Sequence, residues 1–128
     1  MNYLTEGEVI ELHDDILRST GGRLGIHSRH LLKSALERPK TVAYGYVRYR
    51  SVFAKAAAHL DSIANHHVFK DGNKRTAVAA AARLLALNGH ELQITNKEYE
   101  SYILRVVNKK PSIRSIARWL KKHSQPIK

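Results

Sequence analysis

Nine consecutive residues bring together several groups that can do chemistry: His67-Val68-Phe69-Lys70-Asp71-Gly72-Asn73-Lys74-Arg75. His67 is the one side chain in this stretch that can accept a hydroxyl proton near neutral pH. Asp71 offers a hard oxygen ligand of the kind that suits a magnesium ion shared with phosphate groups. We expect Phe69 to point inward and Lys70 to point to solvent. The stretch therefore combines a candidate general base with a candidate metal ligand.

The second half of the stretch has the features of an anion site. Gly72 permits a backbone turn that other residues avoid, and the amides of Gly72, Asn73 and Lys74 lead into a helix expected from Thr76. Amides at the positive end of a helix form a cradle for phosphate. Lys74 and Arg75 fall in the first turn, where cations oppose the helix dipole at a cost of about a few tenths of a kcal/mol each. A bound phosphate would reverse that cost.

Helical periodicity accounts for most of the remaining chain. Thr5 and Glu8 have the spacing of a capping box, which predicts a helix over residues 6–19. Similar signals predict five more helices, beginning after Ser28, at Val52, at Thr76, after Thr95 and after Ser112. The helix over residues 76–87 is apolar almost all round and should occupy the domain centre. The prediction is an all-α, compact six-helix fold with no convincing sheet and a buried central helix after the loop.

Two segments depart from this pattern. Residues 44–50 mix tyrosines and arginines around Gly45, which indicates a loop or a short extended ribbon. The basic tail over residues 123–128 is expected to be flexible. Residues 1–128 are expected to form a single domain, because the chain is long enough for only one hydrophobic core.

Composition narrows the setting and the partners. The chain has no cysteine, which excludes disulfides, thiolate zinc sites and cysteine nucleophiles and predicts a cytoplasmic location. No apolar stretch is long enough to span a bilayer, so no membrane partner is expected. Lys and Arg number 22 against 11 Asp and Glu, giving a net charge of +11. Such an excess favours anionic partners without distinguishing nucleotides, nucleic acid and acidic proteins.

The stretch from His67 to Arg75 resembles the active-site motif of the Fic/Doc family: histidine, any, phenylalanine, any, acidic, small, asparagine, glycine or lysine, arginine. Every defined position matches. The likeness extends over nearly the whole chain, through residues 11–14, Gly22, Gly25-Ile26, Arg38-Pro39 and Asn88-Gly89. It implies that residues 1–128 form a single Fic/Doc domain with the compact six-helix Fic-type fold.

Two positions resemble the Doc branch of the family. Lys74 stands where the adenylyl-transferring branch has a second glycine, and Val78 stands where that branch has a second arginine. The Doc resemblance implies a protein kinase that uses ATP and Mg²⁺ and transfers the γ-phosphate to a protein hydroxyl. It further implies the toxin of a toxin–antitoxin system, with a threonine of elongation factor Tu as the target and inhibition of translation as the outcome.

The resemblance also implies a role for each residue. His67 would be the general base and Asp71 the magnesium ligand. The nucleotide phosphates would be held by Gly72, Asn73, Lys74 and Arg75. Residues 44–50 lie where the family is expected to carry its flap, a ribbon that aligns the target by strand-like pairing. The serine- or threonine-bearing inhibitory helix of some relatives is absent from the sequence, so a separate antitoxin chain is the expected inhibitor.

Alternatives remain open from the sequence. A Fic-type adenylyl transferase (AMPylation) differs from the preferred interpretation only at Lys74 and Val78. A basic helical module that binds nucleic acid would use the charge and the tyrosines of residues 44–50. It would not explain the ordered string from His67 to Arg75, so we do not expect nucleic acid as a partner. A metal site made from His59, His66 and His67 is disfavoured by their spacing.

Overall fold

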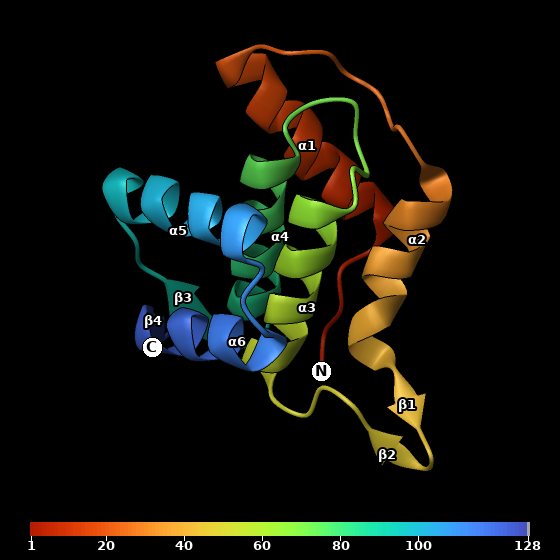
Figure 1. Ribbon diagram of the computed structural model, residues 1–128, viewed down its shortest axis with the longest axis vertical. Helices are drawn as coiled ribbons and strands as arrows, with labels where there is room; N and C mark the ends of the chain where they lie inside the picture. The colour runs from red at the N-terminus through yellow and green to blue at the C-terminus, as the bar shows by residue number, and fades with distance from the viewer. Residues whose placement is uncertain (128) are drawn as a thin grey trace.

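The computed structural model describes residues 1–127 and is predominantly helical (Figure 1). Within this part of the chain, the six α-helices are α1 (Glu6–Thr20), α2 (Arg29–Glu37), α3 (Val52–Asn65), α4 (Asn73–Leu87), α5 (Asn96–Lys109) and α6 (Ile113–Lys122). A 3₁₀ turn, η1 (Arg38–Lys40), extends α2. The all-α expectation is therefore confirmed, and none of the described helices is long and apolar enough to cross a membrane.

Hydroxyl side chains start five of the six α-helices. In each case the hydroxyl oxygen accepts a hydrogen bond from the amide three residues on, and the caps are Thr5, Ser28, Ser51, Thr95 and Ser112. Thr5 with Glu8 and Thr95 with Glu98 form the reciprocal capping boxes that their spacing predicts. These local bonds fix where the helices begin, within a residue or two of the predicted starts.

The core lies around α3 and α4, which run side by side through the middle of the molecule (Figure 1). Small alanine side chains let the two backbones approach closely, and those of α3 and α4 in the core cluster are Ala56, Ala57, Ala77, Ala80 and Ala81. α1 and α2 pack on one side of this pair, and α5 and α6 pack on the other. Two rigid, mutually packed helices therefore hold both ends of the loop that joins them.

Two short ribbons depart from the expectation of no sheet. β1 (Val42–Ala43) pairs with β2 (Tyr46–Val47) in an antiparallel hairpin, which confirms the ribbon expected near residues 44–50. Tyr44 and Gly45 form its turn with φ of 52° and 79°.

The second ribbon corrects the prediction of a flexible tail. β3 (His90–Leu92) pairs antiparallel with β4 (Ser124–Pro126), and the Ile127 amide donates to the Gly89 carbonyl. The tail composition gave no sign of this pairing, because the partner strand follows α4, more than 30 residues earlier in the chain. Lys128, the last residue of the predicted tail, lies outside the described residues.

Candidate active site

The candidate loop joins the end of α3 to the start of α4. α4 begins at Asn73, three residues before the predicted start, so Lys74 and Arg75 lie in its first turn as expected. His67 is exposed and has a left-handed backbone with φ of 52°, which is uncommon for a residue with a side chain. Phe69 is fully buried and Lys70 is exposed, which confirms the predicted orientation of both side chains.

Phe69 is the anchor of the loop. Its ring stacks on the ring of His13 from α1, with centroids 3.9 Å apart. The side-chain amide of Asn73 bonds to both backbone groups of Phe69: Oδ1 accepts from the amide and Nδ2 donates to the carbonyl, each at 2.9 Å. The side chain of Asn73 therefore holds the loop's shape, which leaves its backbone amide as the group that it could offer to the predicted phosphate cradle.

His13 is a supporting residue to which the sequence analysis assigned no role. It is buried in α1, and its Nε2 lies 2.8 Å from the carbonyl oxygen of Asp71. Its Nδ1 lies 3.0 Å from the carboxylate of Asp14. The ring thus bridges α1 to the loop. The signal was present in residues 11–14, which share the family resemblance, but only the fold shows what they contact.

The start of α4 differs from the start of every other α-helix among the described residues, because no side chain caps it. Its N-cap is Gly72, with φ of 77°. The left-handed backbone favours glycine at this position, and a Cβ atom would lie 2.9 Å from Cδ2 of Leu17, so the Leu17 side chain would have to shift to admit one. The first amides of α4 are left for a ligand, and a helix N-terminus of this kind suits an anion.

Charged side chains surround this helix start. The carboxylate of Asp71 is about half exposed at 47% and accepts a hydrogen bond of 3.0 Å from the Arg23 amide. Lys74 and Arg75 are exposed. The Arg75 guanidinium lies 5.5 Å from the ring centroid of Tyr99 on α5, and Arg75 lines a groove of 360 Å³ between α1, α4 and α5. The predicted residues are therefore gathered at one helix start.

Residues 25–28 lie directly beside the loop. The Lys70 amide donates to the Gly25 carbonyl at 3.1 Å, and the Val68 carbonyl accepts from the His27 amide at 2.9 Å and from the Ser28 amide at 3.1 Å. The ring of His27 meets the ring of His67 edge-on, with centroids 4.7 Å apart. His27 is a further site residue that sequence reasoning missed, because no local pattern shows that it contacts a residue 40 positions away.

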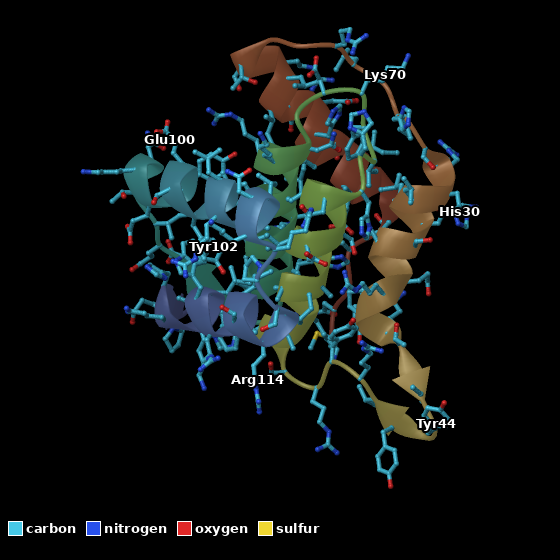
Figure 2. The ribbon with its side chains drawn as sticks, in the orientation of Figure 1. His30, Tyr44, Lys70, Glu100, Tyr102 and Arg114 are labelled. Carbon is cyan, nitrogen blue, oxygen red and sulfur yellow. The ribbon has the colours of Figure 1, made fainter. Side chains whose placement is uncertain are left out.

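The expected place of the flap was wrong. The hairpin of residues 42–47 precedes α3, whereas the loop follows it, and a helix of 14 residues holds the two apart by about 20 Å. Tyr44 and Lys70 accordingly lie at opposite ends of the molecule (Figure 2). The extended segment that pairs with the loop is the one around Ile26, which forms an isolated bridge with Phe69.

The donor set fits a metal ion that arrives with a phosphate ligand. Within residues 1–127 no cluster of three His, Cys, Asp or Glu side chains could hold a metal by itself. Asp71 supplies one half-exposed carboxylate beside the uncapped amides, which matches magnesium's use of few protein ligands together with phosphate oxygens and water. His59, one of the three histidines of the disfavoured metal site, is buried with its Nδ1 3.0 Å from the Ala35 carbonyl oxygen, and burial lowers its pKa to about 4.

The fold and the loop define an all-α domain in which one loop carries an exposed histidine and ends in a helix start that no side chain caps. Residues 3–85 match the model of the Fic/DOC family. "Toxin Doc" of Mycolicibacterium smegmatis is 46% identical over 72 residues, which cover 56% of this chain and 55% of that protein. "Protein kinase doc" of Escherichia phage P1 is 30% identical over 89 residues, 70% of each chain. The chain belongs to the Fic/Doc family, on its Doc branch.

The aligned segments cover part of each relative. The chain spans about half the length of the mycobacterial protein and about two thirds of the phage protein. Residues 3–85, which match the family model, contain the whole loop from His67 to Arg75. The likeness therefore covers the candidate site itself.

Proposed function

We propose that this chain is a Doc-type toxin that transfers the γ-phosphate of ATP to a hydroxyl of a target protein. The observation that carries the proposal is that one short loop carries the exposed His67 and ends in the uncapped start of α4, because this combines a candidate base with a candidate anion site. The printed names of the two relatives, a Doc toxin and a Doc protein kinase, support it. Lys74 and Val78 favour phosphoryl over adenylyl transfer.

The proposed reaction uses the residues of the loop in distinct roles. His67 takes the proton from the target hydroxyl while that oxygen forms a bond to the γ-phosphorus, and the bond to the β–γ bridging oxygen breaks to release ADP. The backbone amides of Gly72, Asn73 and Lys74 hold phosphate oxygens. Lys74 and Arg75 balance their charge. A magnesium ion held by Asp71 would neutralise phosphate charge, and positioning supplies most of the remaining rate.

The groove beside Arg75 supports the same proposal. Its volume of 360 Å³ falls within the range of small-molecule sites and suits the nucleoside part of ATP. Residues 25–28 take over the role first expected of residues 44–50, because their backbone lies against the loop. An extended target segment that paired beside Ile26 would bring its hydroxyl close to His67.

The proposed target is a threonine of elongation factor Tu, with arrest of translation in the cytoplasm as the result. The proposed inhibitor is a cognate antitoxin chain. The net charge of +11 suits an acidic antitoxin segment that orders on binding. Both partners are proposed from the family resemblance, and the printed name of the mycobacterial relative, "Toxin Doc", supports the antitoxin alone.

Transfer from ATP labelled separately at the α- and γ-phosphates tests the function. The purified chain is incubated with purified elongation factor Tu, with cell extract as a second substrate, in the presence of magnesium. We expect γ label alone to reach a protein, and His67→Ala to abolish the transfer. His66→Ala is the matched control, because His66 is the neighbouring exposed histidine and should retain activity.

Each other outcome has a clear meaning. Transfer of α label would make the chain an adenylyl transferase and would overturn the role given to Lys74. Transfer of γ label to a different protein would keep the kinase and replace the target. Absence of both labels from every protein would contradict the proposed enzyme.

A further inference from the structure

A second groove lies at the end of α3 that is remote from the candidate active site. It has a volume of 580 Å³ and runs between the segment joining β2 to α3 and the outer face of α6. Four cationic side chains line it, and we therefore call it the basic groove: Arg48, Arg114, Arg118 and Lys121. Figure 2 shows Arg114 where α6 begins, and the groove joins it to the first turn of α3. Among residues 1–127, none of those that line this groove carries a carboxylate.

The cations of the basic groove destabilise the isolated chain by electrostatic repulsion. Arg114, Arg118 and Lys121 recur at helical spacing, so they lie on one face of α6, where like charges repel each other. Arg114 is also in the first turn, where a cation opposes the helix dipole. α6 contains no acidic residue, and within residues 1–127 none of these three cations forms an ion pair. An anionic partner would remove this repulsion.

The apolar floor of the groove favours a protein partner over nucleic acid. Ile113 and Ala117 from α6 line it together with the aromatic residues Tyr49 and Phe53. Tyr49 is buried at 6% exposure, and the Phe53 ring meets the ring of His90. Tyr49 therefore has no open face on which a base could stack, and the partly exposed Phe53 ring is already in contact with His90, whereas single strands are usually held by stacking on open rings. A segment with aliphatic side chains between carboxylates would match the groove, because the aliphatic groups would meet its apolar floor and the carboxylates its cations.

A second copy of the same chain does not fit the groove. Each chain carries a net charge of +11, so two copies would repel over this basic surface.

The basic groove is also distant from the active-site loop, because the 14-residue helix α3 separates the two by about 20 Å. A partner bound there would leave His67 accessible.

We propose that the basic groove binds an acidic segment of a partner protein, with apolar side chains placed between its carboxylates. Carboxylates pair with the guanidinium groups of Arg48, Arg114 and Arg118, and the apolar side chains rest on the floor. The surface is independent of phosphoryl transfer. It would hold a partner while the candidate active site remains open.

Fluorescence anisotropy with a labelled peptide tests the proposal. The probe is a peptide of repeated Glu-Glu-Leu-Ala units, compared with a peptide of repeated Glu-Glu-Ser-Gly units and with an oligouridylate of matched charge. The groove variant combines Arg114→Gln, Arg118→Gln and Lys121→Gln, three exposed positions whose replacement should leave the helices intact by circular dichroism. We expect this variant to bind the leucine-containing peptide about tenfold more weakly than the unmodified chain.

The control variant removes the same number of charges elsewhere. Lys33, Lys97 and Lys109 are exposed, lie outside the groove and are each replaced by Gln. The control should stay within about twofold of the unmodified chain, since physiological salt largely screens charges that lie more than about 8 Å from the peptide. Equal losses of affinity in the two variants would show that the peptide responds only to net charge, and would overturn the proposal. The proposal would also fail if the unmodified chain did not bind the peptide, or if the groove bound the oligouridylate more tightly than the peptide.

Discussion

The side chain of Asn73 replaces a backbone partner for Phe69, accepting from its amide and donating to its carbonyl at 2.9 Å each. The bonds span four residues and close the loop just before α4 begins. Phe69 is fully buried, so neither backbone group has water as a substitute. The shape of the loop therefore depends on one amide side chain.

Replacing Asn73 with Ala should cost both stability and transfer activity. The two backbone groups of Phe69 lose their partner, and leaving buried groups unpaired typically costs about 1–3 kcal/mol. Urea unfolding followed by circular dichroism measures the loss. Asn108→Ala is the matched control, because Asn108 is exposed in α5 and should change stability by less than about 0.5 kcal/mol. Similar losses in the two variants would show that the Asn73 bonds contribute no special stability.

Gly72→Ala should lower the free energy of unfolding more than Gly89→Ala does. Both glycines have positive φ, at 77° and 89°, so both substitutions incur the left-handed backbone cost of about 1–2 kcal/mol. Only Gly72 adds a clash, because its Cβ would lie 2.9 Å from Cδ2 of Leu17, whereas Gly89 has no atom within 4 Å. The difference between the two free energies of unfolding isolates that clash. Equal values would mean that the Leu17 side chain moves aside freely.

Local signals were enough to predict the helix starts and the chemistry of the loop. A hydroxyl cap acts within three residues, so the caps at Thr5, Ser51 and Thr95 can be recognised in the sequence. The orientation of Phe69 followed from its place between two apolar helices. The start of α4 was predicted three residues late, because Gly72 offers no capping side chain to mark it.

Contacts between distant residues were beyond the sequence. The pairing of Leu92 with Ser124 and the contact of His27 with His67 join segments that are far apart in the chain. Composition carries no record of such pairs, because they arise only when helices pack. The misplaced flap is different. Residues 44–50 precede the helix at Val52 and the loop follows it, so helix length alone argues against their contact.

His27 should act as a positioning residue for His67. The edge-on contact at 4.7 Å restricts the His67 ring, and a poorly oriented base slows proton transfer. His27→Ala should reduce the rate of transfer roughly tenfold, with the apparent ATP affinity unchanged. His27→Phe keeps an aromatic ring at this position and should restore most of the rate. Failure of Phe to outperform Ala would show that ring packing is not the function of His27.

The stability of the fold should fall below neutral pH because of His59. This residue is buried between α2 and α3, its Nδ1 lies 3.0 Å from the Ala35 carbonyl, and burial lowers its pKa from 6.5 to about 4. Between these pH values the unfolded chain binds a proton that the folded chain excludes. The free energy of unfolding should therefore decrease as pH falls from 6.5 to 4, by roughly 3 kcal/mol from this residue.

Urea unfolding at a series of pH values from neutral to 4 measures this dependence. His59→Gln removes the titrating group while keeping a donor for the Ala35 carbonyl, so the variant should lose most of the decrease. His30→Gln is the control, because His30 is exposed and its replacement should leave the decrease in place. A His59→Gln variant with the same pH dependence as the unmodified chain would assign the acid sensitivity to other groups. More than about one pH unit above 6.5, His59 is neutral in both the folded and the unfolded chain, so its contribution should no longer change.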